Sequence, residues 1–302
     1  MDKEYGRKQR NVPRGTFLFS YFLLHLKEYS GIIITVIFTR KDVGVYMAKI
    51  IAVANQKGGV GKTTTCVNLA AALNIMKKRV LLVDMDPQGH SSIGFGANKR
   101  DELPTAYDLI INSTHISHVI RKTPYGDLLH ASTNLAAAEV ELVSVANRHY
   151  ILRDALREVS DKYDFIIIDC PPSLGMLTIN SLCAAERVIV PVDCGFYALE
   201  GLSALTGTMS TIKKSLNPEL DIEGVLLTMF DSRTNLSVQI AQEIKRFFPK
   251  KVFATAIPRN VRLAEAPSHG KPVLEYDKHS RGAECYMNLA AEIIKKQKEE
   301  AL

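Results

Sequence analysis

The sequence contains no tryptophan and only five cysteines, none of which belongs to a Cys-x-x-Cys pair. The number of cysteines is odd and they are widely spaced, at Cys66, Cys170, Cys183, Cys194 and Cys285. A disulfide framework or a zinc knuckle needs cysteines paired at short spacing, so this pattern argues against both. We therefore expect free thiols and a reducing compartment.

Neither sign of charge dominates the composition. The 38 Lys and Arg residues exceed the 32 Asp and Glu residues by six, which favours an acidic partner but is also common on ordinary helix surfaces. The content of 46% hydrophobic and 23% charged residues is that of a globular protein. Residues 47–302 suit a single α/β domain with a large core.

The first 46 residues differ from the rest. A basic start is followed by two apolar runs, residues 17–26 and 32–38, with a polar break between them. The break interrupts a membrane span, and no small-residue cleavage site follows cleanly. We expect residues 1–46 to be an N-terminal extension, either disordered or translated upstream of a true start at Met47, with a membrane tether as the alternative.

The most informative stretch covers residues 49–65. An apolar, β-branched run leads into a glycine-rich loop, and a further apolar run over residues 67–76 has the character of a helix. This order is typical of a phosphate loop, in which backbone N–H groups and the helix N-terminus face phosphate oxygens. The expected nucleotide-binding residues are Gly58, Gly59, Val60, Gly61, Lys62, Thr63 and Thr64. Lys62 would reach the β- and γ-phosphates, and the Thr63 hydroxyl would bind Mg²⁺.

The loop departs from the general pattern at its start. The pattern places a glycine five positions before Gly61, where this sequence has Gln56, and a second lysine follows at Lys57. An ammonium in such a place needs an anion, yet Lys57 cannot easily turn back onto the phosphates of its own loop. We expect a homodimer in which each Lys57 reaches the nucleotide of the other subunit.

Two other apolar runs end in a carboxylate. Residues 79–84 end at Asp84, with Asp86 in the loop beyond, and residues 164–169 end at Asp169. An aspartate at the end of a parallel strand, beside a phosphate loop, is well placed to hold Mg²⁺, usually through water. We therefore assign Asp169 to the metal, with an Asp that merely caps the following turn as the alternative.

The remaining pattern alternates between helix and strand. We expect helices over residues 105–111, 135–146, 150–159, 199–216, 238–248 and 283–296, and strands over 128–131, 187–192, 222–229 and 252–256. Parallel strands need crossover connections, which the helices supply. The sequence thus predicts an α/β fold with a doubly wound, mainly parallel sheet.

Four segments, residues 55–64, 84–89, 168–173 and 257–270, together resemble the ParA/Soj chromosome-partitioning ATPases of the deviant Walker A (MinD/ParA) class. The resemblance covers nearly all of the chain after Met47. It implies a deviant P-loop NTPase that uses ATP and Mg²⁺, dimerises with ATP, binds DNA non-specifically and segregates chromosome origins or plasmids. It also implies slow ATP hydrolysis, stimulated by a ParB-type centromere-binding protein, in the cytoplasm on the nucleoid.

The resemblance also assigns individual residues. Asp86 would position the attacking water, and Pro258 would lie against the adenine, although a purely structural Pro-Arg-Asn turn remains an alternative. Arg233 and Arg262 match arginines used for non-specific DNA binding. Further helpers could be Lys245, Arg246, Lys250 and Lys251, whose alternative is a solvated helix end.

Two competing classes need features that the sequence does not supply. A MinD-like, membrane-associated division-site regulator would need an apolar, basic C-terminal helix, whereas residues 295–300 are a mixed charge run, so we expect no membrane partner. A metabolic or cluster-bearing ATPase would need paired ligand cysteines.

Overall fold

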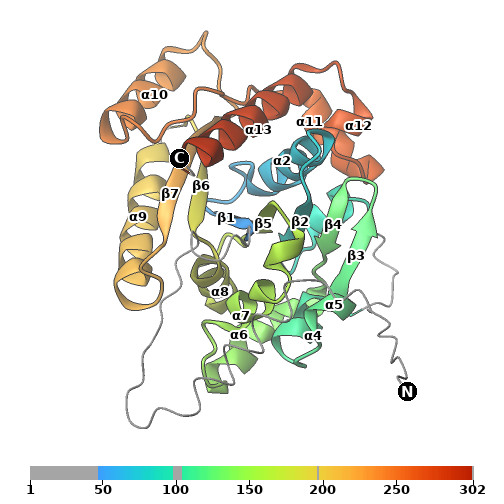
Figure 1. Cartoon of the computed structure of the whole chain (residues 1–302). Coiled ribbons are helices and arrows are strands. Elements are labelled where there is room, and N and C mark those ends of the chain that lie inside the picture. Colours follow the sequence, from blue (N-terminus) through green and yellow to red (C-terminus); the bar gives the residue numbers. More distant parts are fainter. Residues whose placement is uncertain (1–46, 98–103, 196, 301–302) are drawn as a thin grey trace, which may run out of the picture. The chain divides into compact units, whose positions relative to one another are not determined.

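The computed structural model describes residues 47–97, 104–195 and 197–300, so the expected extension over residues 1–46 lies outside the described residues. Within the described part, seven strands form one sheet in the order β3-β4-β2-β5-β1-β6-β7 (Figure 1). The strands are β1 (Lys49–Val53), β2 (Val80–Asp84), β3 (Ile120–Thr123), β4 (Gly126–Leu129), β5 (Phe165–Asp169), β6 (Arg187–Asp193) and β7 (Asp221–Thr228).

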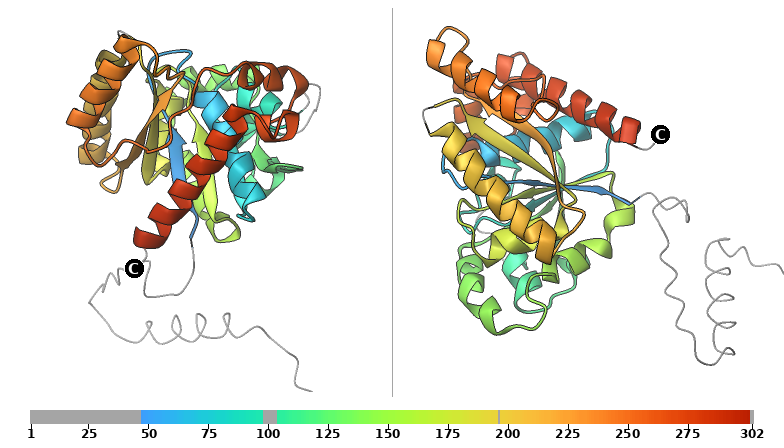
Figure 2. Two further views of the ribbon diagram at one scale, coloured as in Figure 1. Left: turned by 90° about the horizontal axis from the view of Figure 1, so that it is seen from above. Right: turned by 90° about the vertical axis from the view of Figure 1, so that its left-hand side faces the viewer.

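Helices cover both faces of this sheet (Figures 1 and 2). The longer ones are α2 (Lys62–Ile75), α7 (Ile151–Arg157), α8 (Met176–Ala184), α9 (Ala198–Ser215), α10 (Asn235–Phe247) and α13 (Arg281–Glu300). The short ones are α3 (His90–Gly94), α4 (Ala106–Ile110), α5 (Ile116–Val119), α6 (Ala138–Glu141), α11 (Val261–Glu265) and α12 (Val273–Tyr276). Four 3₁₀ turns lie among the described residues, namely η1 (Thr133–Ala136), η2 (Leu142–Ser144), η3 (Ser160–Lys162) and η4 (Ala266–His269).

The sheet is parallel except for β3, which pairs antiparallel with β4. Strand β1 lies between β5 and β6, and its last residue, Val53, is in register with Asp169 of β5. Asp169 is in register with Asp84 of β2 on its other side. The doubly wound, mainly parallel sheet predicted from the sequence is confirmed, and it places the phosphate loop and both carboxylates at one edge.

The central strands are buried on both faces, as their continuous apolar sequences require. Ile51 and Val53 of β1 pack toward α2 and α13, whereas Ile50 and Ala52 pack on the opposite face, in the core that α7, α8 and α9 help to form. Burying one such Ile or Val side chain contributes about 1.5–3 kcal/mol. The loops at the sheet edge therefore rest on a rigid base.

Two expected elements are wrong. Residues 135–146 form two 3₁₀ turns around the four-residue helix α6 instead of one helix. Val140 and Val143 are exposed there, so a continuous helix would gain little by burying an apolar stripe. Residues 252–256 are not a strand, because the N–H groups of Ala254 and Thr255 bond to a side chain instead of to β7. Strand β3, which lies at an edge, was not predicted.

The outer sides of the two outermost strands, β3 and β7, are protected in different ways. On β3, Lys122 is exposed and its Nζ lies 2.6 Å from a carboxylate oxygen of Asp127. Along β7, residues 251–257 run outside the strand, with the N–H of Val225 donating to the carbonyl of Lys251 and that of Ile257 donating to Leu227.

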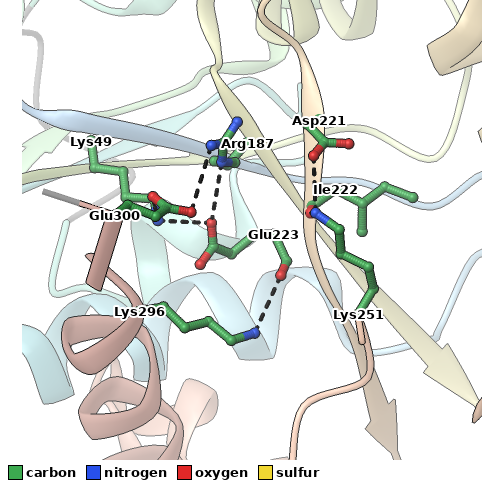
Figure 3. A network of polar contacts seen from close by, with 8 residues as sticks. All are labelled: Lys49, Arg187, Asp221, Ile222, Glu223, Lys251, Lys296 and Glu300. Carbon is green, nitrogen blue, oxygen red and sulfur yellow. Dashed lines mark hydrogen bonds and ion pairs between the residues drawn. The ribbon is translucent and has the colours of Figure 1, made fainter. Parts of the chain in front are cut away.

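A polar network ties the end of α13 to the sheet (Figure 3). The Lys49 ammonium lies 2.8 Å from Glu223 Oε2 and 3.1 Å from Glu300 Oε2. Lys49 and Glu223 are both almost fully buried. Arg187 lies between the same two acids, 3.7 Å from Glu223 and 3.5 Å from Glu300. The last turn of α13 is thus held by cations of β1 and β6, which also pair with the buried carboxylate of β7.

No helix in the described ranges is both long and apolar enough to cross a membrane.

Candidate functional site

The loop between β1 and α2 has the backbone shape of a phosphate loop. Gly59 and Gly61 adopt φ angles of 72° and 88°, in the left-handed region that favours glycine. Gly61 is the N-cap of α2 and its carbonyl accepts the first helical hydrogen bond, from Thr65 N–H at 2.9 Å. The N–H groups at the start of α2 therefore remain available to an anion, as the sequence predicted.

Two side chains hold this loop in place. Asn55 donates from Nδ2 to the carbonyl of Pro191 at 2.8 Å, and its Oδ1 accepts from the N–H of Lys57 at 3.0 Å. Thr228, the last residue of β7, donates to the carbonyl of Val60 at 2.9 Å. The role of Thr228 was missed from the sequence, because the residue lies 168 positions from its partner and no local motif marks it.

The two lysines of the loop have different surroundings. Lys62 is buried, and its ammonium donates to the carbonyl of Lys57 at 3.2 Å. Burial lowers the pKa of Lys62, although the nearby carboxylate of Asp169 opposes this shift. The Lys57 ammonium instead lies 3.4 Å from Asp193 Oδ2 at the end of β6. Lys57 is thus paired within its own chain, a partner that the sequence did not suggest.

Carboxylates and hydroxyls meet beside the loop. Asp169 is fully buried, and its Oδ2 accepts from the hydroxyl of Ser91 at 2.5 Å. Within the described part of the chain, Asp169 Oδ1 has no hydrogen-bond partner. Burial raises the pKa of Asp169, and the hydrogen bond from Ser91 opposes the shift. An unsatisfied, buried carboxylate oxygen is costly unless another ligand completes it.

Asp84 is the second buried carboxylate at this edge. It accepts from the N–H and the hydroxyl of Ser92, at 2.8 and 2.6 Å, and from the N–H of Asp86 at 3.1 Å. Burial raises the pKa of Asp84, and the neighbouring charge of Asp169 raises it further. These bonds fix the loop that carries Asp86, whose own Oδ1 accepts from the N–H of Gln88 at 3.0 Å.

A cavity of 460 Å³ lies over the loop. One wall consists of phosphate-loop residues, another of Asp86, His90 and Pro172, and a third of segments from the C-terminal third of the chain. Of the residues that the sequence assigned to the nucleotide or the chemistry, those lining the cavity are Gly58, Gly59, Gly61, Lys62, Thr63, Thr64, Asp86 and Pro258. Lys57, Val60 and Asp169 are not part of its lining, and Val60 is buried beneath the loop.

The third wall contains the rest of the segment around Pro258, which the resemblance places against the base, and one residue that the sequence did not assign. Arg259 and Asn260 follow Pro258, and Asn260 caps α11 by accepting from the N–H of Arg262 at 2.9 Å. Tyr286 of α13 reaches the cavity, and its hydroxyl lies 3.2 Å from that of Thr65 on α2. Only the packing of α13 on α2 brings Tyr286 to the site (Figure 2), so no local pattern could have indicated it.

Arg233 and Arg262 lie outside the cavity lining, on two segments that the fold places side by side. The N–H of Phe230 donates to the carbonyl of Ile257 at 3.1 Å, so the start of each segment is joined to the other. Arg233 is 87% exposed and pairs with Asp231 at 2.7 Å. Arg262 is 51% exposed and pairs with Glu265 at 2.8 Å and Asp277 at 3.2 Å.

Comparison of the sequence with known proteins gives consistent matches. Residues 48–222 match the family described as AAA domain. The sporulation initiation inhibitor protein Soj of Bacillus subtilis is 54% identical over 249 residues, which cover 82% of this chain and 98% of that protein. The chromosome partitioning protein ParA of Myxococcus xanthus is 50% identical over 252 residues, 83% of this chain and 89% of that protein.

Solved structures with the same fold include a synthase with bound ADP and an ATPase. A cobyrinic acid a,c-diamide synthase from Mycobacterium smegmatis with bound ADP and magnesium is 37% identical, with a TM-score of 0.73 and coverage of 83% of this chain and 96% of that one. The cell division ATPase MinD from Pyrococcus furiosus is 25% identical, with a TM-score of 0.68 and coverage of 82% and 99%. On its phosphate loop, its sheet and its similarity to these relatives over most of its length, the chain belongs to the Soj/ParA family of chromosome-partitioning P-loop ATPases.

Proposed function

We propose that this protein is an ATP-dependent dimerisation switch that binds DNA non-specifically and, with a ParB-type partner that stimulates ATP hydrolysis, segregates chromosome origins or plasmids. The carrying observation is one cavity that joins the phosphate loop, Asp86 and the segment of Pro258. Its volume of 460 Å³ lies within the range of small-molecule sites.

The phosphate side of the cavity suits a triphosphate. Lys62 and the free N–H groups at the start of α2 provide positive charge and donors at one point. Burial lowers the pKa of Lys62, because the charged ammonium has lost water there. A phosphate that pairs with this ammonium would replace the lost water and stabilise the charge. Pro258, at the opposite wall, would lie against the adenine.

The residues present fit a magnesium ion. The Oδ1 of the buried Asp169 is a hard oxygen donor with no hydrogen-bond partner among the described residues, and Thr63 lines the cavity. No group of three or more His, Cys, Asp or Glu side chains in the described residues could hold a metal alone. Asp169 and Thr63 would therefore hold Mg²⁺ together with phosphate oxygens and water, and the ion would neutralise charge on the phosphates.

Asp86 would orient the water that attacks the γ-phosphate. Its carboxylate lies on the cavity wall and is steadied by the Gln88 N–H. The bonds of Asp84 to Ser92 and to the Asp86 N–H hold the loop from below. The reaction converts ATP and water to ADP and phosphate. We propose that this hydrolysis stays slow until the ParB-type partner binds.

Dimerisation would use Lys57, and DNA binding would use the arginines. Lys57 is paired with the half-exposed Asp193, so it can exchange this partner for the phosphates of a second subunit. Arg233 and Arg262 are exposed on adjoining segments, so both guanidinium groups could contact phosphates of the same DNA duplex.

A titration on unrelated DNA duplexes tests the whole proposal. DNA binding is measured with ATP, with ADP and without nucleotide, beside a sizing measurement of the protein. We expect binding only in the ATP-bound dimer, with no sequence preference and with a steep loss of affinity as salt rises through counterion release. Equal binding under all three conditions would break the link between dimerisation and DNA, and binding to liposomes instead would favour a MinD-like role.

A further inference from the structure

The segment of residues 253–257 leads to Pro258, on the cavity wall where the adenine would lie, and it is held both by β7 and by a side chain of α13. At its start, Phe253 donates from its N–H to the carbonyl of Val225 at 3.1 Å, and at its end Ile257 donates to that of Leu227 at 2.8 Å. Between these points, the N–H groups of Ala254 and Thr255 are not paired with β7. They donate to the carboxylate of Glu292 on α13, at 2.9 Å to Oε1 and 3.2 Å to Oε2.

The same part of α13 clamps the segment at a second point. Lys296, one turn beyond Glu292, places its ammonium 4.3 Å from the centre of the Phe253 ring. The ring also lies against Gly224 of β7, where any added Cβ would overlap it. Phe253 thus contacts both strand and helix, and Glu292 holds the N–H groups of the next two residues.

Helix α13 also reaches the cavity directly. Tyr286, nearly two turns before Glu292, lines the cavity and contacts the hydroxyl of Thr65 on α2. The helix thus contacts both the phosphate-loop helix and the segment that ends in Pro258. Together with β7, which bonds to Val60 and to Ile257, α13 therefore connects the two walls.

We infer that Glu292 is a positioning residue for the base-side wall of the nucleotide cavity. It lines no part of the cavity and acts through Ala254 and Thr255, which lie three and two residues before Ile257, where this segment joins the wall. A carboxylate that accepts two backbone N–H groups is a strong, directional anchor. The inference rests on the proposed binding of ATP at this cavity.

The experiment compares ligands that use different walls. Calorimetric titrations with MgADP and with inorganic tripolyphosphate are made on the full chain and on Glu292→Ala and Glu292→Gln. Loss of the anchor should weaken MgADP binding about tenfold in the alanine variant while tripolyphosphate, which needs only the phosphate loop, binds as in the wild type. The glutamine side chain can still accept one of the two hydrogen bonds, so the MgADP affinity of Glu292→Gln should lie between those of the wild type and of Glu292→Ala.

The matched control is Glu299→Ala, which removes from the same helix an exposed acid that pairs with Lys295 at 3.8 Å. It should bind both ligands as the wild type does. An equal loss for both ligands, or no loss for either, would overturn the inference, and the glutamine variant decides it if the alanine variant does not fold. A wild-type protein that binds tripolyphosphate but not MgADP would instead refute the proposed ATP site.

Discussion

The Lys57 ammonium and the Asp193 carboxylate form an ion pair within one chain, 3.4 Å apart, with side chains 36% and 29% exposed. If Lys57 serves the nucleotide of a second subunit, this pair must open first. Asp193→Asn should therefore lower the ATP concentration at which dimers form by up to about fivefold, because such exposed pairs contribute about 0.2–1 kcal/mol. Sedimentation velocity at several ATP concentrations measures this, with Asp154→Asn on α7 as the control of equal charge. Weaker dimerisation of Asp193→Asn would show that Asp193 itself supports the interface.

Separate roles for Asp86 and Lys62 predict different losses. Asp86→Ala should retain ATP binding and dimerisation but lose most of its turnover, since only the orientation of water is removed. Lys62→Ala should bind ATP weakly, because the phosphates lose their buried cation. Phosphate release and equilibrium binding of ATP measure the two effects, and wild-type turnover in Asp86→Ala would contradict the role given to that residue.

The acid beside Arg233 predicts a gain of DNA affinity. The hydrogen bond from Arg233 lowers the pKa of Asp231 to about 2, so Asp231 is charged at neutral pH and offsets the arginine. Asp231→Asn should bind duplex DNA several-fold more tightly, and Arg233→Ala or Arg262→Ala should bind it more weakly, each with ATP-driven dimerisation intact. Titrations at two salt concentrations test this. A variant that no longer dimerises would place its residue in the interface instead.

The buried pair of Lys49 and Glu223 predicts a stability effect. Glu223→Gln leaves the buried Lys49 ammonium with only the half-exposed Glu300 carboxylate at 3.1 Å, which should lower the free energy of unfolding by about 1–3 kcal/mol. Urea unfolding measures the loss. Glu284→Gln at the exposed pair with Arg281 should change stability by less than about 0.5 kcal/mol. A loss of similar size in both variants would refute the importance of burial.

Glu300 predicts the pH dependence of the α13 end. Partial burial raises its pKa, but the hydrogen bond and charge of Lys49 outweigh this, so the pKa lies below the ordinary 4.5. A lowered pKa in the folded state stabilises the fold at pH values above 4.5, and this contribution is lost as the pH falls through the folded-state value. Melting temperatures should therefore fall less steeply below pH 4.5 in Glu300→Gln than in the wild type, and parallel curves would argue against the pair.

The sequence predicted the parts of the site that depend on local pattern. The phosphate loop and the two strand-end aspartates lie where the alternation of strands and helices put them, because parallel strands end at a common edge. Side chains that reach the site from a distance could not be predicted, among them Ser91, Thr228, Tyr286 and Glu292. Their roles depend on how α3, β7 and α13 pack, and a lone serine, threonine, tyrosine or glutamate has no spacing rule that marks it.

The same limit explains the wrong strand over residues 252–256. Its apolar start fits a strand, but the N–H groups of Ala254 and Thr255 bond to the carboxylate of Glu292, which lies about 37 residues later in the chain. Residues 135–146 were expected to form one helix, but Val140 and Val143 are exposed there.

The protection of the two outermost strands, β3 and β7, affects how copies of the protein would behave at high local concentration. If copies of this chain gather on DNA as proposed, they reach high local concentrations, at which an open strand edge could pair with the edge of another copy and start aggregation. Here the charged, four-residue β3 closes one border, and the course of residues 251–257 along β7 closes the other. Under the proposed function, copies gathered on DNA would therefore meet and separate reversibly through side chains and nucleotide, without joining their backbones into a continuous sheet.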